Sequence, residues 1–137
     1  MADQINFELV SPERLLLSEP VEMVVVPGVE GDFGVLPGHA PLVSTVRPGV
    51  IAVFADGKVV QRIFVAGGFA EVTPERCTVL AEQAQAVADI DRAATESEKQ
   101  VARQDLGEAK DETERARLES RIATAEAKLA ALDNPVY

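Results

Sequence analysis

The sequence predicts a β-sandwich or β-barrel domain followed by an antiparallel hairpin of two α-helices. Seven of the eight prolines and eight of the nine glycines lie at or before Pro74, and only Gly107 and Pro135 come later. The last third of the chain is instead rich in Ala, Glu, Arg, Lys, Gln and Leu, which are strong helix formers. We therefore expect a β-sandwich domain over residues 1–87 and a two-helix hairpin over residues 88–137.

Short apolar runs separated by turn residues predict the strands of the first domain. These runs are residues 5–10, 21–26, 50–55, 58–66, 68–73, 76–81 and 83–88. Asp56 and Gly57 form a strong signal for a two-residue hairpin turn between two of them. Residues 31–49 hold three prolines and the only histidine, and they predict a stiff loop between strands. Many short strands of this kind are typical of a sandwich or a barrel.

Helical spacing predicts two helices, over residues 91–106 and residues 111–132. Asp89 or Asp91 can cap the first helix at its N-terminus, and Gly107 is expected to cap its C-terminus. The expected apolar stripes are Ile90, Ala94, Val101, Ala102 and Leu106 in the first helix, and Leu118, Ile122, Ala125, Leu129 and Leu132 in the second. Because the predicted seam is narrow and rich in alanine, we expect a marginally stable hairpin that can rearrange.

Charge and composition exclude several classes of function. The formal net charge is −10, with 11 acidic and 5 basic residues in residues 1–86 and 12 acidic and 8 basic residues in residues 87–137. Neither part offers a basic face for nucleic acid. No apolar run is long enough to span a bilayer, and the first ten residues do not resemble a secretory signal, so we expect membrane association only through partners. A single cysteine, Cys77, fits a reducing compartment.

The sequence offers no set of residues for catalysis or metal binding. One histidine, His39, and one cysteine supply neither a nucleophile with its base nor enough ligands for zinc. No GxxxxGK[ST] phosphate loop is present, and the pair Gly67-Gly68 is better explained by close approach of two backbones. We therefore expect no catalytic residue, no metal and no cofactor.

Two segments carry a resemblance to a known family. They are GDFGVLPGHAPLV followed by RPG, within residues 31–49, and VAGGFAEVTPERCTVLAE, over residues 65–82. Both resemble the epsilon subunit of bacterial F-type ATP synthases, and the resemblance extends over essentially the whole chain. It implies a non-catalytic subunit of the central stalk that binds the gamma subunit and the membrane c-ring and couples their rotation in proton-driven ATP synthesis. It also implies a peripheral location at the cytoplasmic face of the bacterial inner membrane.

The resemblance also implies residues that contact the ring. In the family, the loop that matches residues 31–40 lies against the polar loops of the c-ring. Asp32 and His39 occupy the matching positions, and Glu30 lies beside them. The alternative interpretation of Glu30 and Asp32 is a solvated loop tip. For His39 it is a loop histidine whose ring bonds neighbouring backbone or packs at an interface.

The start of the first predicted helix resembles a nucleotide-binding motif of some epsilon subunits, Ile/Leu-Asp-x-x-Arg-Ala. The chain has Ile90 and Asp91, but Ala94 stands in place of the arginine and Thr95 in place of the alanine. Arg92 comes two positions early, about 200° away around the helix. We therefore predict that this chain binds ATP weakly or not at all.

The resemblance implies that the hairpin is a regulatory element that can reach the catalytic alpha and beta subunits. The basic residues available for such a contact are Arg103, Arg115, Arg117 and Arg121. A solvated helix face with intrahelical ion pairs explains the same residues. Two other functions remain open on the residues alone. One is a free-standing β-barrel that binds a ligand, which requires an apolar pocket, and the other is a coiled-coil adaptor.

Overall fold

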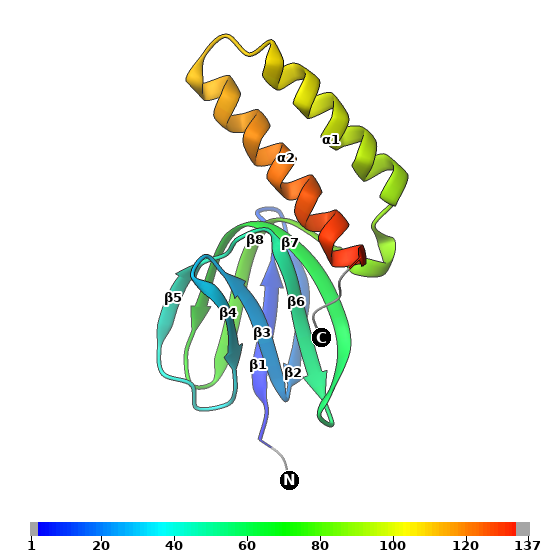
Figure 1. Cartoon of the computed structure of the whole chain (residues 1–137). Helices are drawn as coiled ribbons and strands as arrows, with labels where there is room; N and C mark the ends of the chain where they lie inside the picture. The colour runs from blue at the N-terminus through cyan, green and yellow to red at the C-terminus, as the bar shows by residue number, and fades with distance from the viewer. Residues whose placement is uncertain (1–2, 134–137) are drawn as a thin grey trace. The chain divides into compact units, whose positions relative to one another are not determined.

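A computed structural model describes residues 3–133, which form two compact units, a β-unit up to residue 86 and a helical unit from residue 87 onwards (Figure 1). The β-unit contains the strands β1 Ile5–Val10, β2 Leu15–Val21, β3 Met23–Gly28, β4 Gly31–Val35, β5 Leu42–Thr45, β6 Gly49–Ala55, β7 Lys58–Val72 and β8 Arg76–Ala86. The helical unit contains a 3-10 turn, η1 Val87–Asp89, and the helices α1 Arg92–Gly107 and α2 Glu112–Asp133.

The long strands β7 and β8 take part in both layers of a sandwich. The strand order is β2-β1-β8-β7-β6-β3-β4, and β5 pairs with β7 off this path. Residues 58–65 of β7 pair with β6, whereas residues 69–72 pair with β5. Strand β1 runs parallel to β8 along residues 76–80 only. The sheet therefore folds over along β7 and β8, with β2, β1 and β5 in one layer and β4, β3 and β6 in the other. The predicted β-sandwich followed by a helical hairpin is confirmed.

Two glycines allow β7 to pass from one layer to the other. Gly67 and Gly68 have φ angles of +72° and +121°, a region that side chains disfavour. A Cβ atom added to Gly68 would lie 1.8 Å from the backbone oxygen of Leu80 in β8. Glycine is therefore required at the bend, as expected for a close approach of two backbones.

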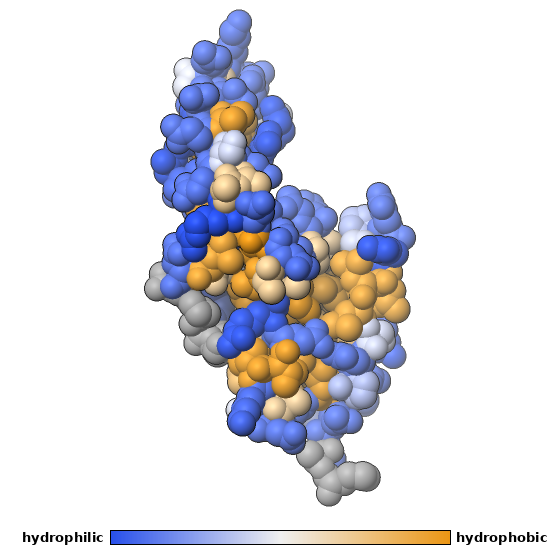
Figure 2. All heavy atoms as spheres, turned by 90° about the vertical axis from the view of Figure 1, so that its right-hand side faces the viewer, coloured by the Kyte–Doolittle hydropathy of each residue, from blue (hydrophilic) through white to orange (hydrophobic). Residues whose placement is uncertain are grey.

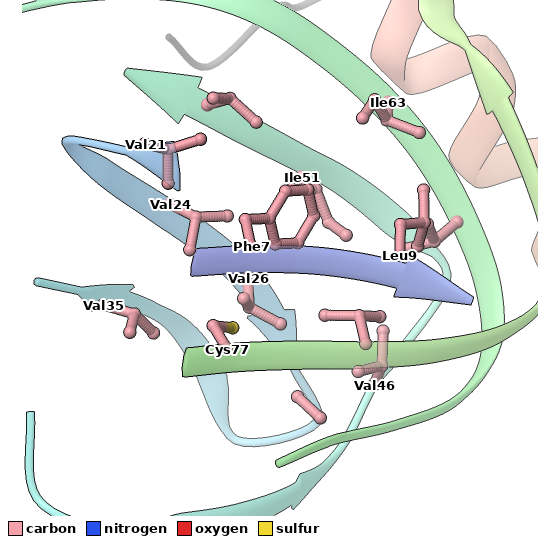
Figure 3. Close-up of a cluster of buried hydrophobic side chains, with 14 of the residues drawn as sticks. Phe7, Leu9, Val21, Val24, Val26, Val35, Val46, Ile51, Ile63 and Cys77 are labelled. Carbon is pink, nitrogen blue, oxygen red and sulfur yellow. The ribbon is translucent and has the colours of Figure 1, made fainter. Parts of the chain in front are cut away.

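The interior between the layers is filled by apolar side chains from both of them (Figure 3). Phe7, Val24 and Ile51 are among the fully buried ones. Cys77 belongs to this core, and burial raises the pKa of its thiol to about 12. The thiol therefore stays protonated at neutral pH, which makes it a packing residue and a poor nucleophile.

The structure differs from the predicted strands mainly between residues 15 and 45. Strand β2 was not predicted, and residues 31–49 do not form one loop, because they contain β4 and β5. Both of these strands are short, and each pairs with one neighbour only. Prolines 37, 41 and 48 lie outside the strands and separate them. The runs predicted at 58–66 and 68–73 belong to one strand, β7. The runs predicted at 76–81 and 83–88 likewise belong to one strand, β8.

The predicted turn at Asp56 and Gly57 is confirmed, with φ angles of 54° and 75°. Two positive φ angles in succession are typical of the type I′ hairpin turn. The Glu22 carboxylate accepts hydrogen bonds from both backbone N–H groups, at 2.8 Å and 3.2 Å. Glu22 therefore ties the β6–β7 turn to the link between β2 and β3.

Aspartates begin both helices. The Asp91 side chain accepts a hydrogen bond from the N–H of Ala94 at 3.0 Å, so Asp91 is the predicted N-cap. Asp111 caps α2 in the same way through the N–H of Glu114, at 2.8 Å. The prediction for Gly107 is wrong, because it is the last helical residue and Glu108 is the C-cap.

The residues buried between the helices agree with the apolar stripe predicted for α2, but only in part with the stripe predicted for α1. Leu118, Ala125 and Leu129 of α2 are buried. In α1 the buried residues are Thr95 and Ala102, whereas Ala94 and Val101 of the predicted stripe are exposed. A threonine can occupy this seam because its hydroxyl donates a hydrogen bond to the backbone oxygen of Asp91, at 2.7 Å.

Replacing Gly68 should destabilise the β-unit strongly. We expect Gly68→Ala to lower the free energy of unfolding by at least about 3 kcal/mol, because the new Cβ atom collides with β8 at an unfavourable φ. Gly34→Ala is the matched control, since its Cβ atom would meet only the Met23 sulfur, at 3.6 Å. Denaturant unfolding would measure both variants, and equal stability of the two would contradict a required bend.

Candidate functional site

The turn between β3 and β4 carries two of the residues predicted as contacts. Gly28 pairs with Gly31 at its base, so Val29 and Glu30 form the tip. The Glu30 side chain is exposed and has no hydrogen-bond or ion-pair partner within residues 3–133. Asp32 lies on the first part of β4, opposite Pro27. The structure therefore presents Glu30 and Asp32 side by side at one end of the β-unit.

An arginine that sequence analysis did not single out holds this turn. Arg47, between β5 and β6, forms an ion pair with Asp32 at 2.6 Å from Nη2 to Oδ1. Its Nη1 donates to the backbone oxygen of Gly28, and its backbone N–H donates to the oxygen of Pro27 at 2.9 Å. The RPG of the first family-like segment was the only signal in the sequence that marked Arg47.

His39 lies away from the two acidic residues. Strand β4 separates them, since Asp32 is near its start and His39 is four residues beyond its end. At about 3.3 Å per residue, the two positions lie at opposite ends of this strand. Gly38 donates its backbone N–H to the oxygen of Pro74, at 2.8 Å, which fixes the His39 turn to the β7–β8 connection.

The His39 ring is engaged locally. Its Nδ1 lies 2.6 Å from the backbone oxygen of Ala40. Because a carbonyl oxygen only accepts hydrogen bonds, Nδ1 carries the proton in this arrangement. The contact agrees with the expected loop histidine that bonds neighbouring backbone, and it provides no acid–base partner.

Exposed apolar residues adjoin the acidic tip. Val43 of β5 and Phe69 of β7 point outward from the same face, with 67% and 47% of their areas exposed. Val29 is 55% exposed, and its backbone N–H donates to the oxygen of Thr45 at the end of β5, at 3.0 Å. We call Val29, Val43 and Phe69 the β5 patch. Grouped exposed apolar residues of this kind mark interaction surfaces.

Apolar surface is not confined to the β5 patch. Leu15 of β2 and Val60 of β7 are each 55% exposed. Figure 2 views the molecule from the side opposite to β5 and shows apolar side chains gathered there on the β-unit, between polar ones. Exposed apolar surface on more than one side suits a protein that contacts more than one partner.

A hollow on the β-unit does not resemble a ligand site. It lies between the end of β2 and the β6–β7 turn, and its lining includes Glu19, Glu22, Val60 and Gln61. Its polar groups bond to one another, because Glu19 accepts a hydrogen bond from Gln61 at 2.8 Å and Glu22 caps the turn. Among the described residues, no three His, Cys, Asp or Glu side chains are grouped to hold a metal ion.

The three residues of the nucleotide-like motif have structural roles in the helical unit. Ile90 is buried, Asp91 caps α1, and Arg92 forms an ion pair with Asp133 at the end of α2. The hydrogen bond from Arg92 lowers the pKa of Asp133 below its ordinary value. This pair therefore favours the closed hairpin at neutral pH, and its contribution is lost as the pH falls through the lowered pKa. Ala94, at the position of the motif arginine, is exposed.

The basic residues of the helices are accessible. Arg103 of α1 forms an ion pair with Glu126 of α2 at 3.5 Å, which joins the helices a second time. Arg115, Arg117 and Arg121 of α2 are exposed. Neither α1 nor α2 is long and apolar enough to cross a membrane.

Comparisons with known proteins converge on one family. Residues 4–87 match the family model described as ATP synthase, Delta/Epsilon chain, beta-sandwich domain. A relative from Rhodospirillum rubrum named ATP synthase epsilon chain is 60% identical over 131 residues, covering 96% of this chain and 98% of its own. A relative of the same name from Mesorhizobium japonicum is 46% identical over 132 residues, covering 94% of this chain and 98% of its own.

Solved structures agree with this relationship. A chain in the Euglena gracilis mitochondrial ATP synthase, from a structure of OSCP, F1 and the c-ring, has a TM-score of 0.80 and 29% identity. The match covers 94% of this chain and 81% of that chain. A chain from the central stalk and c-ring of the Tetrahymena thermophila mitochondrial ATP synthase has a TM-score of 0.66 over 96% of this chain and 98% of its own. With 14% identity, this second match shows the fold alone.

Proposed function

We propose a function that proceeds from one finding: the chain belongs to the family of ATP synthase epsilon chains. It is an accessory, peripheral subunit of the rotor stalk and is not catalytic by itself. In our proposal it binds the gamma subunit and the c-ring and transmits rotation between them during proton-driven ATP synthesis. The Euglena match, taken from an assembly that contains F1 and the c-ring, supports these partners.

One observation carries this proposal, namely a sandwich whose interior is filled by apolar side chains and whose outer surface carries exposed apolar residues. Transmission of torque needs a body that does not deform, and the core shared by two layers provides it. The free-standing binding barrel is disfavoured because the interior is filled and the polar groups of the surface hollow are already bonded. We place the subunit at the cytoplasmic face of the bacterial inner membrane, attached through its partners.

We assign the rotor function to residues 1–87 and a regulatory function to the hairpin, residues 88–137. The family match to residues 4–87 and the separate helical unit from residue 87 support this division. A chain that ends at residue 87 should unfold cooperatively and still bind its stalk partners. A shortened chain that shows no folded state by circular dichroism would contradict the division.

The β3–β4 turn is our proposed contact with the polar loops of the c-ring. Glu30 supports this role because it is an exposed acid without an internal partner, and Asp32 lies beside it. The adjoining β5 patch supplies apolar contact area. His39, at the opposite end of β4, is proposed as a further contact with the c-ring.

A photo-crosslinker on Glu30→Cys should label the c-ring in the assembled enzyme. We would attach benzophenone maleimide to this cysteine, since the native Cys77 is buried and its raised pKa keeps it unreactive. Lys58→Cys, at the exposed start of β7, is the matched control and should give little ring product. Equal ring labelling from both positions, or none from Glu30→Cys while the complex stays assembled, would reject this contact.

The hairpin is proposed to act through its basic surface and not through nucleotide. In this proposal, Arg115, Arg117 and Arg121 of α2 reach the acidic surfaces of the alpha and beta subunits when the hairpin opens. Arg92 contributes no phosphate contact because it is paired with Asp133, and Ala94 provides no guanidinium.

ATP should bind poorly to the isolated chain. A missing charge-assisted contact costs about 1.5–3 kcal/mol, or about ten- to a hundredfold in affinity. Titration calorimetry should therefore detect no binding at micromolar ATP, whereas Ala94→Arg, which restores the motif arginine at an exposed position, should gain affinity. A micromolar dissociation constant for the unaltered chain would refute the prediction.

A further inference from the structure

The end of the β3–β4 hairpin extends beyond the part of β3 that pairs with β6. Strand β3 pairs with β6 only along Met23, Val24 and Val25. Its last three residues, 26–28, have no partner in β6; they pair with β4 on one side, and on the other Gly28 forms an isolated bridge with Val46. A two-stranded end of this kind is marginally ordered in water unless other contacts hold it.

Arg47 and its neighbours supply those contacts, and Arg47 supplies them with its side chain as well. Its backbone N–H bonds to the oxygen of Pro27, and its neighbour Val46 forms an isolated bridge with Gly28. Its guanidinium then spans the hairpin, with Nη1 on the oxygen of Gly28 in β3 and Nη2 on the carboxylate of Asp32 in β4. One side chain therefore joins both strands at the base of the Glu30 tip.

The same contacts set the charge that the tip presents. The Asp32 carboxylate is paired with a cation at 2.6 Å, whereas Glu30 has no such partner within residues 3–133. The side chains of Arg47 and Asp32 are 41% and 28% exposed, and ion pairs at this exposure contribute little to global stability. Any effect of the pair is therefore expected at the turn itself, where both partners lie.

We propose that Arg47 is a positioning residue for the acidic tip, holding Glu30 toward the partner while neutralising Asp32. This inference rests on the proposed ring contact of the β3–β4 turn. A planar fork with two separate N–H edges is needed to reach Gly28 and Asp32 together, which a lysine ammonium cannot do in the same geometry.

Hydrogen exchange on the full chain tests the positioning without any partner. The reporter is the Val29 N–H, which bonds to Thr45 beside the tip. Arg47→Ala should speed its exchange by about tenfold or more, because the end of the hairpin opens locally. Arg47→Lys should give an intermediate rate. Arg76→Ala, which removes the ion pair with Glu8 elsewhere in the β-unit, is the matched control and should leave Val29 unchanged.

Crosslinking in the assembled enzyme tests whether this positioning of Glu30 matters for its contact with the c-ring. Arg47→Ala should lower ring labelling from benzophenone on Glu30→Cys several-fold, while the midpoint of thermal unfolding stays close to that of the parent chain. Unchanged Val29 exchange, or a fall in labelling matched by Arg76→Ala, would overturn the positioning role. If Glu30→Cys labels no ring even with Arg47 present, the ring contact fails, and the exchange experiment alone decides whether Arg47 positions the tip.

Discussion

The bend of β7 at Gly67 and Gly68 is the constraint on which the rest of the β-unit depends. Because the strand changes layer there, its first part pairs with β6 and its last part with β5. The carbonyl of Gly68 also accepts the N–H of Val46, at 3.0 Å. Val46 precedes Arg47, so the bend fixes the backbone from which the guanidinium reaches the tip. A core feature and an exposed acidic turn are thereby connected through the Gly68–Val46 hydrogen bond and the side-chain contacts of Arg47.

The features that sequence analysis predicted are those encoded locally. Asp56-Gly57, the Asp91 cap and the α2 stripe each depend on residues a few positions apart, and each is found as expected. Apart from the end of α1 and its buried stripe, the features it missed depend on distant residues. Strands β4 and β5 are short edge strands between prolines, and they form only because β3 and β7 lie beside them. The pair of Asp32 and Arg47 spans 15 residues, so no local pattern reveals it.

The candidate site shows the same division. Glu30 and Asp32 were found because a family-like segment marked them, and the structure brings them together at one turn. That segment also marked His39. The sequence did not reveal that the intervening residues form β4, which places His39 at the other end of this strand from Asp32. Proximity along a chain therefore overestimated proximity in space. The sequence also gave no sign that Asp32 is neutralised, which changes the charge available to a partner.

The hairpin is built on weaker contacts than the sandwich, and this difference suits a part that rearranges. Its seam buries small residues such as Ala102 and Ala125, and exposed ion pairs join the helices. Exposed pairs stabilise little, so closed and open arrangements can differ by only a few kcal/mol. Arg92 is central to that balance. While it bonds Asp133 it favours closure, and its guanidinium is then directed toward that carboxylate. In the proposed regulatory role, opening of the hairpin would depend on what competes for its ion pairs, and partner surfaces rich in carboxylates would compete for its arginines.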